Sequence, residues 1–232
     1  MIAPTKQDAL ATPRHDDFLT DARNRMVDSQ IRPNKVSDPR ILDAMRHLPR
    51  EMFLPEGLRA LAYSDQNVPL GNGRVLLQPM VLARLVQAAE ALPNETALVI
   101  AAGTGYSAAL LAAIGCKVTA LESGGASLPA KSALAAAAPL VTSETGSLRE
   151  GWPAGGPYDI ILIDGAVSEV PSALASQLRH GSGRLLTIIR NSEHTGYAVQ
   201  AEPTQAGISV RQLFDCVCPL LPEFVPAPTF KF

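Results

Sequence analysis

The sequence predicts an α/β protein with a mostly parallel, doubly wound sheet that follows an N-terminal helical extension. Its 232 residues suit one core of moderate size with an appendage. From Thr96 onward, short apolar runs alternate with helical stretches, and each run ends in a turn. This alternation is typical of parallel strands joined by crossover helices. The residues before Thr96 show helical spacing instead.

Four parts are expected along the chain. Residues 1–18 mix proline, threonine, aspartate and lysine without periodicity and predict a loose leader. Residues 19–95 would hold the N-terminal helices and a long loop, and residues 96–218 would form the α/β core. The last part, 219–232, is an apolar tail spaced by prolines.

The N-terminal helices are predicted from the spacing of apolar residues and from a cap. Apolar side chains recur at helical intervals within 18–31 and again within 41–48. Asp38 and Pro39 supply a cap and a first turn for the second helix. The stretch 62–79 carries prolines and glycines and predicts an irregular loop. An amphipathic helix is expected to follow over 80–92.

Each strand of the sheet is predicted by a short apolar run. Parallel strands are expected at 97–102, 117–122, 139–143, 158–164 and 183–190, with helices at 106–114, 128–138 and 170–178. The segments 197–203 and 208–220 flank Gly207 and predict an antiparallel pair at the sheet edge. In that pair, Cys216 and Cys218 would share one face of a strand.

The composition argues against several classes of protein. The 20 basic and 22 acidic residues give a net charge of −2, so no broad cationic surface for nucleic acid is expected. No signal peptide and no run of the ~18 apolar residues that a membrane span needs is visible, which predicts a cytoplasmic protein. The three cysteines lack the C-x-x-C spacing, and the four histidines lack ligand spacing, so no metal site is proposed.

A nucleotide crevice is predicted where the first core strand ends. The run 97–102 enters Gly103, Thr104 and Gly105 and then a helix, which places backbone amides at a helix N-terminus. Glu122 ends the second strand, where a carboxylate can accept both ribose hydroxyls of an adenosine ligand. The glycine pair alone leaves open a simple strand-to-helix turn.

Several motifs occur in the order found in one known family. They are MVDSQIRP, PREMFLP, AYSDQNVPLGNGRVLLQP, GTGYSAALLA, GWP and YDIILIDGAVSEVP. Together they resemble the protein-L-isoaspartate O-methyltransferases from about Arg25 to Cys218. The resemblance implies a Rossmann-like S-adenosylmethionine-dependent methyltransferase fold with seven strands. It also implies S-adenosylmethionine as methyl donor and damaged aspartyl residues in proteins as substrate. In that family, the methyl ester collapses to a succinimide and so begins repair.

The resemblance also assigns candidate site residues. The cofactor-binding set that it implies is Ala101, Gly103, Gly105, Tyr106, Glu122, Thr145, Gly146 and Asp164. The candidate catalytic set is Asp65, which matches the acid of the family loop, Arg74, and Leu77 at the position of the family's catalytic serine.

The chain departs from the family pattern in the substrate loop. The family pattern G-x-G-Q-T-I-S-x-P aligns with residues 71–79, where the threonine is Val75 and the serine is Leu77. Methyl transfer to a carboxylate depends on positioning an oxygen that is already anionic, and those hydroxyls do the positioning. Arg74 could grip the carboxylate with two hydrogen bonds instead. A solvated loop arginine is the alternative.

The cofactor motifs depart as well. The family acid and first glycine at the end of the first strand are Val99 and Ala101, and a methyl group at Ala101 crowds a close backbone approach. At the third strand, the family's G-D-G is Glu144, Thr145 and Gly146. Asp164 stands where the family has a small neutral residue, and a turn aspartate is its alternative.

Three functions are compatible with these features. The first is a family member, weakly active or inactive in isoaspartyl methylation, that serves as a binding or accessory subunit of a protein assembly. Its alanine-rich helix SLPAKSALAAAAP and its tail LLPEFVPAPTFKF would dock on a protein partner, although the tail could equally be a strap across its own domain. The second is an active isoaspartyl methyltransferase. The third is a methyltransferase for a small carboxylate or another acceptor.

Overall fold

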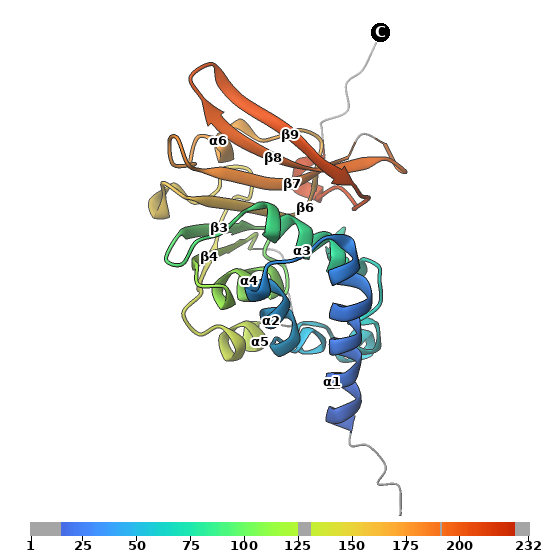
Figure 1. Ribbon diagram of the computed structural model, residues 1–232. Helices are drawn as coiled ribbons and strands as arrows, with labels where there is room; N and C mark the ends of the chain where they lie inside the picture. Colours follow the sequence, from blue (N-terminus) through green and yellow to red (C-terminus); the bar gives the residue numbers. More distant parts are fainter. Residues whose placement is uncertain (1–14, 125–130, 191, 226–232) are drawn as a thin grey trace, which may run out of the picture.

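The computed structural model describes residues 15–124, 131–190 and 192–225, and a seven-stranded sheet dominates it (Figure 1). The strand order is β5-β4-β3-β6-β7-β8-β9. The strands from β5 to β7 are parallel, while β8 is antiparallel to both of its neighbours. The predicted α/β class, the mostly parallel sheet and the N-terminal helical extension are confirmed.

The strands lie close to their predicted positions. They are β3 (Thr96–Ile100), β4 (Lys117–Glu122), β5 (Thr142–Thr145), β6 (Ile160–Val167), β7 (Arg184–Arg190), β8 (Gly196–Thr204) and β9 (Gly207–Asp215). The predicted strand 208–220 is too long, because the chain leaves the sheet after Asp215. Cys216 and Cys218 therefore lie beyond β9, and the prediction that they share a strand face is wrong. Cys218 is buried and Cys216 is half-buried.

The helices are α1 (His15–Met26), α2 (Pro39–His47), α3 (Pro79–Ala88), α4 (Tyr106–Ala113), α5 (Lys131–Ala137) and α6 (Ser172–Ala175). Because α1 begins at His15, the predicted leader extends too far, and residues 1–14 lie outside the described ranges. The first part of the predicted helix 128–138 lies outside them too. In Figure 1, α1 and the β8–β9 hairpin lie at opposite ends of the molecule. None of the helices in the described ranges is long and apolar enough to span a bilayer.

Two local predictions have different outcomes. Asp38 caps α2 as expected, because its carboxylate accepts the Arg40 amide at 2.9 Å. The predicted helix 170–178 is reduced to the four residues of α6, since Leu178 forms a bridge with Tyr158 instead. The Tyr158 amide donates to the Gln177 carbonyl at 2.8 Å, which draws this segment out of a helical path.

The stretch predicted as an irregular loop contains a small hairpin. Its strands are β1 (Val68–Gly71) and β2 (Arg74–Leu76). Asn72 and Gly73 join them with φ angles of 51° and 72°, which is the left-handed pair that an Asn-Gly turn favours. The hairpin points Arg74 toward the main sheet, where it becomes part of the candidate site.

The central strands of the sheet are buried on both faces. Along β3, Ala97 and Val99 pack into one cluster with α2, α3 and α4, whereas Leu98 and Ile100 pack into a second cluster on the other face. The second cluster is completed by residues of α6 and by Leu221 and Phe224 near the C-terminus. The C-terminal segment therefore forms part of the cover of the sheet.

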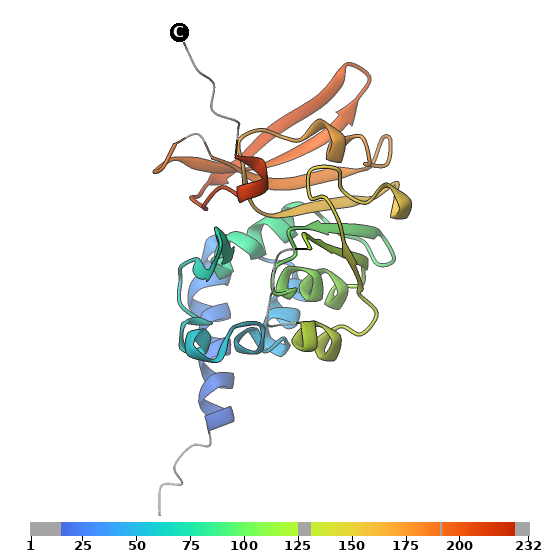
Figure 2. The ribbon, with the colours of Figure 1, turned by 180° about the vertical axis from the view of Figure 1, so that it is seen from behind.

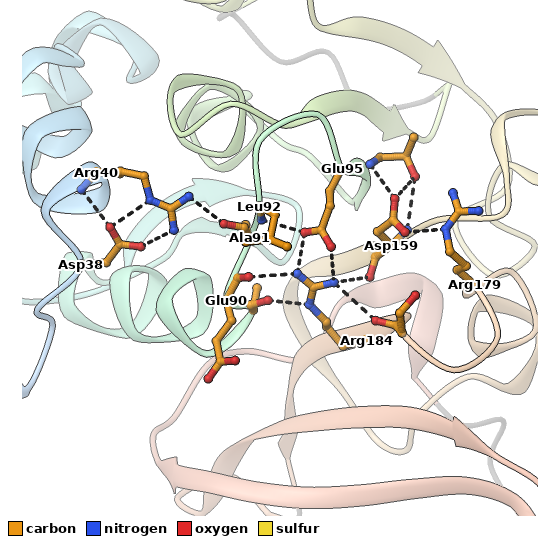
Figure 3. A network of polar contacts seen from close by, with 12 residues as sticks. Asp38, Arg40, Glu90, Ala91, Leu92, Glu95, Asp159, Arg179 and Arg184 are labelled. Atoms are coloured by element: carbon orange, nitrogen blue, oxygen red, sulfur yellow. Dashed lines mark hydrogen bonds and ion pairs between the residues drawn. The ribbon is translucent and has the colours of Figure 1, made fainter.

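A polar network fixes the amino-terminal edge of the sheet (Figure 3). Arg184, at the start of β7, donates to both carboxylate oxygens of Glu95, at 2.9 and 2.6 Å. Asp159 accepts the Thr96 amide at 2.9 Å and pairs with Arg179. These contacts join the segment after α3 to the starts of β3, β6 and β7. The candidate site lies at the opposite, carboxyl-terminal edge of the sheet.

Candidate active site

The candidate site lies at the carboxyl-terminal edge of the sheet, between β3 and β6. The order of the strands along the chain reverses here, since β3 pairs with β4 on one side and with β6 on the other. Ligands of open α/β sheets bind outside such a switch point. The turn 101–105, Glu122 at the end of β4, and Asp164 on β6 all meet at this edge.

The turn after β3 uses left-handed backbone at three positions. Ala101, Gly103 and Gly105 have φ angles of 58°, 58° and 90°. A Cβ atom at Gly105 would lie 2.8 Å from Cδ2 of Leu134 on α5, so glycine is needed there for packing as well. Ala101 has no such freedom, and its left-handed conformation costs about 1 kcal/mol. The backbone is therefore strained at Ala101, where the family has glycine.

We expect Ala101→Gly to cost about 1 kcal/mol less unfolding free energy than the same change at a neighbouring buried alanine with ordinary backbone, because glycine relieves the left-handed strain at position 101. The matched control is Ala102→Gly. Ala102 is not among the residues with positive φ, so this change should be destabilising by about 0.5 to 1 kcal/mol. Urea unfolding measures both variants. Equal losses of stability in the two variants would show that Ala101 is not strained.

Glu122 is held in place by backbone amides. One carboxylate oxygen accepts the Gly103 amide at 2.9 Å, and the other accepts the Ser123 amide at 2.8 Å. A cavity of about 120 Å³ opens beside this carboxylate. Ligand pockets usually measure ~300 Å³ or more, so neighbouring side chains must move for a nucleoside to enter.

Some of the predicted cofactor residues line this cavity and others do not. Its lining contains Ala102, Gly103, Thr104, Gly105, Ala120, Glu122, Ser123, Gly124, Leu134, Ser143, Glu144 and Thr145. Gly103, Gly105, Glu122 and Thr145 are thus brought together as expected. Ala101, Tyr106, Gly146 and Asp164 are not in the lining. Ser123 and Ser143 were not predicted, because nothing in their local sequence distinguishes them from other serines.

Arg74 is buried in the site. Its side chain is only 6% exposed, and Nη2 donates to Glu122 at 2.7 Å and to Glu223 at 2.8 Å. The alternative of a solvated loop arginine is therefore wrong. Glu223, which the sequence did not single out, comes from the short 3₁₀ turn η6 (Pro222–Phe224).

The other residues of the substrate-type loop lie apart from this ion pair. Leu77 is 1% exposed and its side chain belongs to the hydrophobic core. Asp65 is exposed and accepts a hydrogen bond from Gln78 Nε2 at 2.7 Å. In the described residues, no hydrogen bond or ion pair joins Asp65 to Arg74, Glu122 or Asp164.

A second polar group lies beneath the crevice. Arg50 is fully buried, donates from Nε to the Ala62 carbonyl at 2.7 Å and from Nη2 to the Leu77 carbonyl at 2.5 Å, and stacks over the Tyr106 ring. Asp164 is 7% exposed and accepts the Ser107 hydroxyl at 2.6 Å. Arg50 belongs to the motif PREMFLP, but the sequence did not show its role, because its partners are backbone carbonyls from distant segments.

Buried polar atoms without a hydrogen-bond partner gather around the crevice. Those that do so are Arg50 Nη1, Arg74 Nη1, Thr104 Oγ1, the Tyr106 hydroxyl, Asp164 Oδ1 and Glu223 Oε2. Buried polar groups nearly always find a partner in the protein or in ordered water, and a cluster without protein partners offers such contacts to a ligand as well. Unpaired donors and acceptors at a strand switch point therefore fit a polar ligand with several hydrogen-bonding groups. A cofactor that joins a nucleoside to an amino acid has this character.

Asp164 makes the free energy of unfolding depend on pH. Burial raises the pKa of Asp164 to about 7, and the hydrogen bond from Ser107 and the charge of Arg50 offset this only in part. The raised pKa means that the folded chain holds a proton that the unfolded chain has released. The free energy of unfolding therefore falls as the pH rises from about 4 to about 7, and this contribution is constant above that range.

We expect this residue to lower the free energy of unfolding by about 2 to 3 kcal/mol between about pH 5 and pH 8. Asp164→Asn cannot titrate and should lack this part of the pH dependence. The measurement is the difference in urea unfolding free energy between the wild type and Asp164→Asn at the two pH values. A difference that stays the same at both would show that Asp164 has an ordinary pKa.

Comparisons with known proteins agree with this geometry. The model of the family "Protein-L-isoaspartate(D-aspartate) O-methyltransferase (PCMT)" matches residues 21–219. Protein-L-isoaspartate O-methyltransferase 1 of Rhodopseudomonas palustris is 40% identical over 186 residues, covering 77% of this chain and 76% of the relative. The enzyme of Methylorubrum extorquens is 40% identical over 167 residues, covering 72% and 73%.

Solved structures share the fold. A Plasmodium falciparum beta-aspartate methyltransferase, solved in complex with S-adenosyl-L-homocysteine, superposes with a TM-score of 0.72 at 18% identity. The match covers 87% of this chain and 98% of that one. A protein-L-isoaspartate O-methyltransferase superposes with a TM-score of 0.71 at 22% identity, over 85% of this chain and 65% of that one. At these identities, the likeness shows the methyltransferase fold.

Proposed function

This chain belongs to the protein-L-isoaspartate(D-aspartate) O-methyltransferase family, and we propose that it is an active S-adenosylmethionine-dependent carboxyl methyltransferase for isoaspartyl residues of damaged proteins. The observation that carries the proposal is the placement of Glu122. Its carboxylate is fixed by two backbone amides at the strand switch point, beside a cavity lined by the glycine turn. This is where an adenosine ribose is held in such sheets.

The chain's own residues divide into a cofactor side and an acceptor side. Glu122 would accept the ribose hydroxyls, and the turn from Gly103 to Gly105 would bring its backbone close to the ligand. When bound, S-adenosylmethionine supplies a methyl group that passes to a carboxylate oxygen while the sulfur keeps the electron pair of the broken bond. Thr145 and Glu144, at the end of β5, also line the cavity, and the adenine would lie beside them.

The acceptor side needs no general base. The isoaspartyl carboxylate is an anion at neutral pH, so the protein must position it and exclude water rather than remove a proton. Leu77 cannot hydrogen-bond this carboxylate and lies in the core. The positioning therefore falls to charged side chains of the site. Because two loop hydroxyls are missing, we expect slower transfer than the family loop would give.

The proposal is tested in two steps. Isothermal titration with S-adenosylhomocysteine should give micromolar binding, and labelled methyl should pass from S-adenosylmethionine to an isoaspartyl peptide as a base-labile ester. A peptide of the same sequence with normal aspartate is the control and should not be labelled. Absence of cofactor binding, or equal labelling of the two peptides, would refute the proposal.

A binding or accessory subunit is the second candidate. It is favoured by the ion pair of Glu223 with Arg74, which occupies the guanidinium next to Glu122, and by the missing hydroxyls at Val75 and Leu77. A protein partner would then dock on the alanine-rich helix α5 and on Leu140, which follows it in the sequence and is 92% exposed. Cofactor binding without any labelled ester, together with a stable assembly in native purification, would favour this candidate over the enzyme.

A further inference from the structure

The C-terminal segment is anchored across the carboxyl-terminal edge of the sheet (Figure 2). Leu220 forms a parallel bridge with Ala166 of β6, and the Leu221 amide donates to the Ala166 carbonyl at 2.9 Å. Leu221 and Phe224 are 2% and 5% exposed and belong to the second core cluster. Residues 220–225 thus form a strap over their own domain. A strap was one of the two alternatives expected for the tail. Residues 226–232 lie outside the described ranges.

Glycines on both neighbouring elements make room for this strap. A Cβ atom at Gly73 would lie 2.7 Å from Cγ of Pro222, and one at Gly165 would lie 2.7 Å from Cγ of Leu221. Any side chain at either position would push the strap away. The strap therefore fits closely between the β1–β2 turn and β6, and this fit carries Glu223 into the crevice.

In the crevice, Glu223 forms an ion pair with Arg74, but each side chain keeps one atom without a hydrogen-bond partner. One oxygen, Oε1, accepts from Arg74 Nη2 at 2.8 Å and from Ser123 Oγ at 3.1 Å. The same Nη2 also donates to Glu122 at 2.7 Å, so one nitrogen serves two carboxylates. Arg74 Nη1 and Glu223 Oε2 are buried without partners. A carboxylate that bonded both Nη1 and Nη2 would satisfy the guanidinium better than Glu223 does.

Resting on the proposed function, we propose that Arg74 positions the acceptor carboxylate and that Glu223 occupies this place until an acceptor displaces it. Arg74 lies next to Glu122, the predicted ribose ligand, and so next to the cofactor crevice. It lies in the loop that lost its hydroxyls at Val75 and Leu77. The ligand class is a carboxylate on an extended peptide. The carboxylate of that peptide must therefore compete with the carboxylate of Glu223 for the guanidinium of Arg74.

The test measures binding of an isoaspartyl peptide to the full chain with S-adenosylhomocysteine present, by fluorescence anisotropy. Glu223→Gln removes the competing charge and should tighten peptide binding about three- to tenfold. Arg74→Gln should weaken it about tenfold or more, and Arg74→Lys should recover part of that loss, since lysine keeps the charge but not the fork. Glu169→Gln removes an exposed charge near the strap and should change binding by less than about twofold.

Three outcomes would overturn the inference. They are Glu223→Gln with unchanged or weaker binding, Arg74→Gln with wild-type binding, and absence of peptide binding in every variant. In an active enzyme, Glu223→Gln should lower KM with kcat unchanged, which a purely structural role would not produce. The two proposals fail separately. If the variants change peptide binding as expected but no methyl group is transferred, only the proposed function is refuted. If methyl transfer occurs at the same rate in the Arg74 and Glu223 variants as in the wild type, only this inference is refuted.

Discussion

Replacing Glu122 with alanine is expected to weaken S-adenosylhomocysteine binding at least about 100-fold. The carboxylate would accept two ribose hydroxyls, and hydrogen bonds to a charged acceptor contribute about 1.5 to 3 kcal/mol each. It also fixes the Gly103 amide at 2.9 Å and the Ser123 amide at 2.8 Å, so the turn that faces the ligand loses its support. Both effects act in the same direction. Isothermal titration measures the change.

Glu150→Ala is the matched control for this variant. It removes the same charge from an exposed side chain outside the cavity lining and should change the affinity by less than about threefold, since the described contacts give the Glu150 side chain no hydrogen bond. A thermal melt of each variant separates lost affinity from lost folding. Equal losses in the two variants would mean that general electrostatics, rather than a ribose contact, governs binding.

Replacing Arg50 with methionine is expected to lower the free energy of unfolding by about 3 to 5 kcal/mol. Arg50 is fully buried and joins the Ala62 and Leu77 carbonyls, at the two ends of the loop that carries the β1–β2 hairpin. Methionine fills much of the space but leaves both carbonyls buried without donors. The loop would then lose its fixed position, and cofactor affinity should fall along with stability.

Arg59→Met serves as the control, because Arg59 is exposed on the 3₁₀ turn Glu56–Leu61 and its side chain makes none of the described hydrogen bonds. Its unfolding free energy should stay within about 0.5 kcal/mol of the wild type. Urea unfolding compares the two variants directly. A loss below about 1 kcal/mol in Arg50→Met would show that water can replace the guanidinium at both carbonyls.

The fold could be predicted well from the sequence because its signals are local. Each buried strand of the core is a short apolar run, and burial on both faces of a parallel sheet requires such runs. The predictions failed where a distant contact decides the local structure. The helix at 170–178 was cut to four residues by the bridge between Leu178 and Tyr158. The β1–β2 hairpin was missed although Asn72 and Gly73 carry its turn signal.

The site could be predicted only in part, for the same physical reason. Gly103 and Glu122 sit at strand ends, and strand ends of a parallel sheet always meet at one edge. Arg74 was named as a candidate site residue from the sequence, but its burial and its ion pair with Glu122 were not predicted. Arg50 lies in the motif PREMFLP and Glu223 in the tail LLPEFVPAPTFKF, but neither was named as a site residue, because their partners lie far away in the sequence and only the closed fold brings them together.

The most direct test of the account is to follow repair itself. An isoaspartyl peptide is incubated with the wild-type chain and S-adenosylmethionine, and its products are separated by chromatography over time. We predict that a succinimide forms first and then the normal aspartyl peptide, only when the cofactor is present and more slowly with Arg74→Gln. An isoaspartyl peptide that remains intact while the chain binds S-adenosylhomocysteine would contradict this prediction.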